Sequence, residues 1–186
     1  MDETLQKELG KDEKLLWKAS PVAFETLDAT YKKHITKKIV ITCAIILAIL
    51  IAYIIFALTN GGGVKIVVVG ILLLVAVCAS INNFTDAATL KKAVYAATDK
   101  RLIFIGDSVK SVDYDAIGKA AFKKDDDGHY TLLCGSAISS KPAEWRSLTV
   151  AGPKIDEESK LCTRFAMYAV PDHEKVQKLL SEYISF

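Results

Sequence analysis

The sequence predicts a two-span membrane hairpin of α-helices plus a small, mostly antiparallel β domain capped by a C-terminal helix. Three observations lead to this fold class. Residues 39–81 hold a single charged side chain, Lys65, although 25% of the whole chain is charged. A turn rich in glycine, residues 59–63, divides this apolar stretch. After residue 93 the pattern changes to short alternating segments separated by turn residues, which is typical of strands.

The first predicted span, Ile39 to Leu58, is apolar on all sides and holds no charge. A helix of about 20 residues covers about 30 Å, the thickness of a hydrocarbon core. The second span, Val64 to Ile81, is apolar apart from Lys65, whose long side chain can reach the membrane interface. Because the turn between them is short, we expect the two helices to run antiparallel.

Basic side chains flank the spans on one side only. They are Lys32, Lys33, Lys37 and Lys38 before the first span, and Lys91 and Lys92 after the second. The positive-inside rule then predicts a multi-pass protein of the cell (inner) membrane with both termini in the cytoplasm. The acidic start of the chain and the late first apolar run predict that there is no secretory signal peptide. The six lysines only set the topology, or they also attract anionic lipid headgroups.

Three regions follow from this pattern. Residues 1–38 form an N-terminal cytoplasmic segment, with a short strand over 13–18 and an amphipathic basic helix that begins at Ser20-Pro21. Residues 39–84 form the hairpin. Residues 85–186 form the β domain, whose Pro171-Asp172 opens a closing helix. The predicted strands lie at 94–98, 101–106, 109–115, 118–124, 129–135, 145–150 and 161–170, of which 145–150 is the weakest.

Small residues recur on one face of the first span, at Ala44, Ala48 and Ala52. Such a stripe lets another helix approach closely. It packs the hairpin against itself, drives homo-oligomers, or packs on partner helices of a transport or secretion complex. Gly70, Ala76 and Ser80 are partial counterparts on the second span.

No motif supports catalysis or a cofactor. The chain contains no GxSxG, no P-loop and no GxGxxG, and its three histidines are far apart. The tip Asp125–Gly128 lacks the spacing of a calcium loop and is interpreted as a solvated hairpin turn. The net charge of +2 does not indicate nucleic acid as a partner. The four cysteines are expected to be free thiols, with a Cys134–Cys162 bridge as the alternative.

Several segments together resemble the bacterial pleckstrin-homology-like membrane protein family. The segments are DEKLLWKASP (12–21), the two apolar spans, YAATDKRLIF (95–104) and YDAI (114–117). The resemblance covers most of the chain from residue 12 onward, and residues 136–160 depart from the family pattern. It implies a bent, seven-stranded antiparallel sandwich or partly open barrel that is closed by the C-terminal helix.

The resemblance implies little about function, because such domains bind lipids, peptides or copies of themselves. Lys100 and Arg101 form a candidate anion patch at a two-residue tip, with a structural contact of Arg101 as the alternative. The leading hypothesis is a non-enzymatic adaptor, anchored in the bilayer, that engages a protein, a peptide or its own copies. The alternatives are a sensor of anionic lipid or envelope state, and an accessory subunit of a transport complex.

Overall fold

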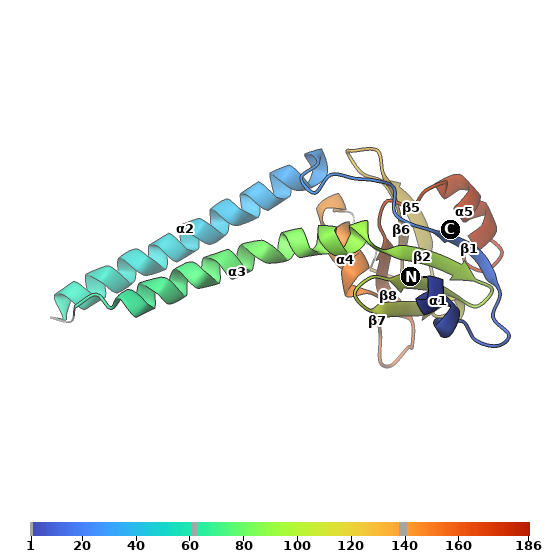
Figure 1. The fold of residues 1–186 in the computed structure, drawn as a ribbon, viewed down its shortest axis with the longest axis horizontal. Helices are drawn as coiled ribbons and strands as arrows, with labels where there is room; N and C mark the ends of the chain where they lie inside the picture. Colours follow the sequence, from blue (N-terminus) through green and yellow to red (C-terminus); the bar gives the residue numbers. More distant parts are fainter. Residues whose placement is uncertain (1, 61–62, 138–140) are drawn as a thin grey trace.

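A computed structural model describes residues 2–60, 63–137 and 141–186, without the side chains at 2, 76 and 79–83. Two long helices, α2 (Ala29–Thr59) and α3 (Ile66–Lys91), lie side by side and project from a compact β domain (Figure 1). Their turn lies at the far end of the hairpin, and their other ends lie against the domain. The predicted turn at 59–63 falls partly on residues 61–62, which are outside the described residues.

Helix α2 begins at Ala29, so the predicted helix start at Ser20-Pro21 is wrong. Residues 20–28 are irregular. The backbone N–H of Val22 donates to the carbonyl of Ala169 at 2.7 Å, which holds this segment along the β domain. Asp28 supplies the N-cap instead, because its carboxylate accepts from the N–H of Tyr31 at 3.1 Å.

The hairpin buries only one narrow face. Along α2 the half-buried side chains Ile46, Leu50 and Ile54 and the buried Ala57 recur at helical spacing, as expected for the face turned to α3. Among the described residues, α2 is the one helix long and apolar enough to cross a membrane, and α3 carries a shorter apolar stretch over Ile66–Val75. The length and the apolar composition of these helices support association with a membrane.

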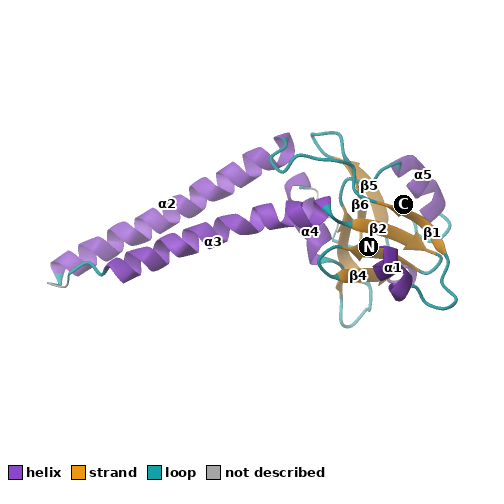
Figure 2. Cartoon of the chain, in the orientation of Figure 1, coloured by secondary structure: helices purple, strands orange, loops and turns teal. Residues whose placement is uncertain are grey.

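The β domain consists of two four-stranded antiparallel sheets (Figure 2). The first has the order β1-β2-β3-β4 and the second the order β5-β6-β8-β7. The strands of the first are β1 (Leu15–Ala19), β2 (Val94–Thr98), β3 (Arg101–Ile105) and β4 (Val109–Asp113). Those of the second are β5 (Ala120–Lys124), β6 (Tyr130–Cys134), β7 (Lys154–Ile155) and β8 (Cys162–Met167). Within the described part of the chain no strand pairing joins the two sheets, so they do not close into a barrel.

The hairpin is inserted between two neighbouring strands of one sheet. Strand β1 precedes the hairpin and β2 follows it, and the two pair antiparallel with Trp17 opposite Ala97. The β domain therefore contains residues from both sides of the hairpin. Both ends of the hairpin are consequently fixed to the same sheet.

Three short helices and two 3-10 turns complete the domain. They are α1 (Asp2–Glu8), η1 (Tyr114–Ala116), η2 (Pro142–Glu144), α4 (Trp145–Ala151) and α5 (His173–Leu180). The predicted strand at 145–150 is wrong, because Trp145, Arg146 and Thr149 bury one side of helix α4, which is followed by Gly152 with φ +79°. Helix α5 confirms the predicted closing helix, with Val176 and Leu180 buried.

The main core lies between the two sheets. Its largest fully buried side chains are Trp145, Tyr95, Tyr168, Phe104 and Phe165. A second cluster lies on the other face of the first sheet, where Leu5 of α1 covers apolar side chains of β2 and β3. The four cysteines are free thiols, exposed at Cys43 and Cys78 and buried at Cys134 and Cys162, so the alternative of a bridge is wrong.

Candidate functional site at the base of the hairpin

The hairpin meets the β domain around one buried cation, Arg146 of α4. Only 3% of this residue is exposed. Its guanidinium donates to the backbone carbonyls of Thr26 at 3.0 Å and Glu25 at 3.1 Å, and to the carboxylate of Asp28. These three acceptors belong to the segment that leads into α2, and the Tyr168 hydroxyl of the domain is a fourth acceptor at 3.1 Å. Arg146 therefore ties the start of the hairpin to a helix of the domain.

Three aromatic rings surround the same guanidinium. Its central carbon lies 3.6 Å from the ring centroid of Tyr31, 4.3 Å from that of Phe24 and 4.9 Å from that of Tyr168. A cation over the face of an aromatic ring is attracted by the ring quadrupole, and more strongly where water is excluded. Charge, hydrogen bonds and packing thus act on Arg146 together.

The hydroxyl of Tyr31 joins α2 to α4 directly. It donates to the carbonyl of Pro142 at 2.7 Å and accepts from the backbone N–H of Arg146 at 3.1 Å. Burial raises the pKa of this phenol well above its usual value, so it stays protonated and acts as a donor. The first turn of α2 is therefore fixed to the start of α4.

The tip of the β5–β6 hairpin completes the junction. The Asp127 carboxylate accepts from the backbone N–H groups of Ala29 at 2.9 Å and Thr30 at 2.8 Å, which satisfies two free donors at the start of α2. Asp125 is buried, and its carboxylate accepts from the Tyr168 hydroxyl at 3.0 Å. The interpretation of this tip as a solvated turn is therefore wrong.

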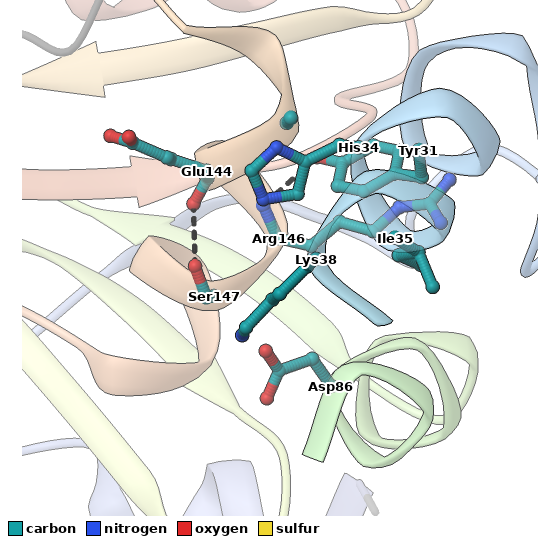
Figure 3. Close-up of a pocket in the computed structure, with 9 residues that line it drawn as sticks. Tyr31, His34, Ile35, Lys38, Asp86, Glu144, Arg146 and Ser147 are labelled. Atoms are coloured by element: carbon teal, nitrogen blue, oxygen red, sulfur yellow. Dashed lines mark hydrogen bonds between the residues drawn. The ribbon is translucent and has the colours of Figure 1, made fainter. Parts of the chain in front are cut away.

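A polar pocket of about 250 Å³ opens beside this junction (Figure 3). Tyr31, His34, Ile35 and Lys38 line it from one face of α2, and Asp86 lines it from α3. The domain contributes Ala143, Glu144, Arg146 and Ser147. Figure 3 shows the Lys38 side chain extending toward Asp86 and the Ser147 hydroxyl donating to the Glu144 carbonyl, at 2.9 Å.

The lysines predicted at the membrane interface all lie at the domain end of the hairpin. Lys32, Lys33, Lys37, Lys38, Lys91 and Lys92 are exposed. Two of them have partners in the structure. Lys91 donates to the Thr26 hydroxyl at 2.9 Å, and Lys38 lines the pocket beside Asp86. The structure thus brings the two lysine groups to one level, and their interaction with lipid stays a prediction.

The alanine stripe does not face α3. Ala44, Ala48 and Ala52 are exposed, whereas the face containing Ile46 and Leu50 is partly buried. The stripe is therefore available to another helix, and it does not pack the hairpin against itself. Of its proposed counterparts, Gly70 is exposed, and the side chains of Ala76 and Ser80 lie outside the described residues.

The candidate anion patch has a structural partner on one of its two members. The Arg101 guanidinium donates to both carboxylate oxygens of Glu13, at 2.8 and 2.9 Å, and to the carbonyl of Glu8 at 2.7 Å. The Glu13 side chain is only 4% exposed, and Arg101 lowers its pKa to about 2. This geometry favours the structural alternative for Arg101, while Lys100 is exposed at the turn.

Sequence reasoning missed the residues that build the junction. An arginine in the segment EWRSLTV is typical of the protein surface. The backbone carbonyls that accept from the Arg146 side chain lie more than 100 residues away. One signal was available, because Tyr31, His34, Ile35 and Lys38 follow the spacing of a single helix face. Comparison of the chain with protein-family models, curated proteins and solved structures finds no match.

Proposed function

We propose that this chain is a non-enzymatic binding module anchored in the cytoplasmic membrane. In this proposal the α2–α3 hairpin crosses the bilayer twice, and the β domain lies at the cytoplasmic face. The module engages a protein or peptide partner, or a second copy of the chain. A pleckstrin-homology-like character of the β domain is part of the proposal, supported by the motifs at 12–21 and 95–104.

The observation that carries the proposal is the exposed apolar surface of α2. None of its most apolar window is buried. The exposed large apolar side chains between residues 40 and 58 are Val40, Ile41, Ile45, Leu47, Ile49, Ile51, Ile55, Phe56 and Leu58. Each such side chain gains about 1.5–3 kcal/mol on leaving water, so a hairpin of this kind needs an apolar environment around it. A bilayer supplies that environment over the whole length of α2.

The direction of insertion follows from where the charges lie. The six lysines at the domain end contrast with Lys65 alone near the turn, and the positive-inside rule places the richer end in the cytoplasm. Strand β1 before the hairpin and strand β2 after it share one sheet, which is compatible only with both hairpin ends on the same side. The pairing supports only that both ends lie on one side, and the proposed cytoplasmic side rests on the lysines alone.

Self-association is the form of binding that the structure supports best. The exposed Ala44-Ala48-Ala52 face has small side chains at every fourth residue, and close approach of helices in a bilayer depends on such residues. The buried contacts of Arg146 fix the domain to the hairpin, so pairing of two hairpins would also bring two β domains together.

Two cysteine experiments test the proposal, both in a background with Cys43 and Cys78 replaced by alanine. For topology, Gly63→Cys near the turn should react with an impermeant maleimide in intact cells, and the exposed Glu158→Cys should react only after the cells are opened. The reverse pattern would contradict the proposed orientation. For self-association, Ala48→Cys should give disulfide-linked dimers in membranes, whereas the matched Ile46→Cys, on the partly buried face, should not. Equal crosslinking at both positions would contradict a specific interface.

A second candidate function is a sensor of anionic lipid, favoured by the exposed lysines Lys32, Lys33 and Lys37 at the base of α2. Each lysine near an anionic surface contributes about 1 kcal/mol, and salt screens the attraction. Replacing all three by glutamine should then change the protease accessibility of the β domain in anionic proteoliposomes but not in neutral ones. If the variant and the wild type are digested identically in anionic and in neutral proteoliposomes, this candidate function is wrong.

A further inference from the structure

The pocket at the base of the hairpin lies where the headgroups of a membrane would be. Lys38 directly precedes the apolar run that begins at Ile39, and Asp86 follows the end of the second apolar run by about one and a half helical turns. If the hairpin spans the bilayer as proposed above, the pocket opens at the level of the inner headgroups. A lipid could therefore enter it without leaving the membrane.

The lining of the pocket includes a basic and an acidic side chain that come from different helices. His34 and Lys38 lie four residues apart on one face of α2, and Ser147 lines the pocket from α4, where its hydroxyl donates to the Glu144 carbonyl (Figure 3). The carboxylate of Asp86 lies on the opposite helix, α3, with the Lys38 side chain extending toward it. The Glu144 side chain turns away from this space, and Glu144 pairs with Lys141 at 3.4 Å. The pocket thus offers a cation on α2, Lys38, and a carboxylate on α3, Asp86, to one ligand.

Asp86 is the acidic group of the pocket. It is half-buried, and burial raises its pKa, while the charge of Lys38 acts in the opposite direction without restoring the usual value. A carboxylate near the membrane is costly unless it is paired. A ligand that brings its own ammonium would favour the charged form of Asp86.

The size of the pocket matches that of a small lipid headgroup. A volume of about 250 Å³ holds about eight water-sized groups, at about 30 Å³ each. A phosphoethanolamine group has about eight non-hydrogen atoms and carries a phosphate and a primary ammonium at its two ends. Phosphocholine is bulkier, and its quaternary ammonium has no N–H to donate to a carboxylate.

We infer that this pocket binds the headgroup of a zwitterionic phospholipid with a primary amine, of the phosphatidylethanolamine class. The phosphate lies against Lys38 and a ring N–H of His34, and the ammonium donates to Asp86. The inference rests on the proposed membrane anchoring and adds the identity of a lipid bound at the junction. The lipid would bridge α2, α3 and α4, so it would act as a further connection between the hairpin and the β domain.

Native mass spectrometry of the full chain in detergent tests the inference. Dioleoyl phosphatidylethanolamine, phosphatidylcholine and phosphatidylglycerol are added separately at equal concentrations, and the fraction of protein that retains one lipid is measured. We expect phosphatidylethanolamine to be retained about tenfold better than phosphatidylcholine, the effect of one hydrogen bond to a charged group. Asp86→Asn should reduce this preference to about twofold or less. Lys38→Gln should weaken retention of phosphatidylethanolamine. The matched control is Lys37→Gln, because Lys37 is the neighbouring residue and does not line the pocket, and it should leave retention unchanged.

The outcomes that overturn the inference are distinct from those that overturn the anchoring. Equal retention of the two zwitterionic lipids, preference for phosphatidylglycerol, or an unchanged preference in a folded Asp86→Asn protein would each refute the headgroup site. Displacement of the lipid by free phosphoethanolamine or inorganic phosphate at lipid-like concentrations would assign the pocket to a soluble ligand instead. Carbonate extraction of cell membranes reports on anchoring alone, because a protein that stays in the pellet is anchored whichever lipid it binds.

Discussion

Replacing Arg146 by methionine should destabilise the fold more than any exposed substitution of the same kind. Methionine keeps an unbranched stem among the three aromatic rings but removes every donor. Arg146→Met leaves Asp28, whose side chain is only 8% exposed, as a buried carboxylate without its cation. It also leaves the carbonyls of Thr26 and Glu25 without this partner.

The expected loss follows from these contacts. Removing one partner of a buried ion pair costs about 3–5 kcal/mol, mainly because the other charge stays buried. The lost cation–π attraction adds about 1 kcal/mol, and packing of the methionine offsets part of it. We therefore expect a decrease of about 4 kcal/mol in the free energy of unfolding. Because domains of this size are stable by about 5–15 kcal/mol, such a loss is readily measured.

A double-mutant cycle separates the ion pair from the packing. Guanidinium unfolding of the full chain in detergent can be followed by the fluorescence of Trp145, which is 1% exposed, in a Trp17→Phe background. Asp28→Asn added to Arg146→Met should recover about 2 kcal/mol, because it removes the unpaired charge. The control is Arg164→Met on β8, which is exposed and should change stability by about 0.5 kcal/mol or less. A loss of less than about 1 kcal/mol in Arg146→Met, or no coupling to Asp28, would refute the reasoning.

Three further predictions use the same assay. Glu13→Gln should cost up to about 3 kcal/mol above pH 5, because Arg101 lowers the pKa of Glu13 from 4.5 to about 2. The stabilisation is complete above the unfolded pKa and is lost as the pH falls toward 2, so wild type and variant should converge there; a constant difference would contradict this. Asp127→Ala should cost about 1–2 kcal/mol by removing two capping hydrogen bonds of α2, whereas the exposed Asp126→Ala should be nearly neutral. Gly135→Ala should cost about 3 kcal/mol or more, because φ is +114° and a Cβ would lie 2.5 Å from the Thr163 carbonyl oxygen. At Gly128 φ is +91° but the nearest side-chain atom is 3.7 Å away, so Gly128→Ala should cost about 1 kcal/mol; equal costs would contradict the steric argument.

The elements that the sequence predicts well are those with a strong local pattern. The alternating strands before and after Asp99-Lys100 and the amphipathic helix after Asp172 appear where their patterns place them. The apolar helix up to Thr59 appears as well, because its end is marked by a polar and glycine-rich turn. In each case the signal lies within about ten residues of the feature that it predicts.

The parts that the sequence does not predict depend on partners far along the chain. Val150 and Leu148 with neighbouring Thr149 suggest a strand, but burial of Trp145 against the core selects a helix. The start of α2 is set by Asp28 and by Asp127, which lies almost 100 residues away. A local helix-start signal such as Ser20-Pro21 does not decide where the helix begins when the tertiary structure provides a better N-cap further along the chain.

The inserted hairpin has a consequence for any soluble version of the β domain. A fragment that starts at residue 94 lacks β1, so the edge of β2 is left unpaired, and it lacks Leu5, which covers Ala96 and Ile103. It also lacks Asp28 and the two carbonyls that hold Arg146, which leaves this cation without its anionic partner and with only the Tyr168 hydroxyl among its acceptors in the described part of the chain. Residues 2–31 joined by a flexible linker to residues 86–186 would restore all of these contacts. We expect the joined fragment to unfold cooperatively on heating, as measured by near-ultraviolet circular dichroism, and the 94–186 fragment to aggregate or to show no transition. A stable, cooperative 94–186 fragment would mean that β1 and the Arg146 contacts contribute little, and it would contradict the central role assigned to the junction.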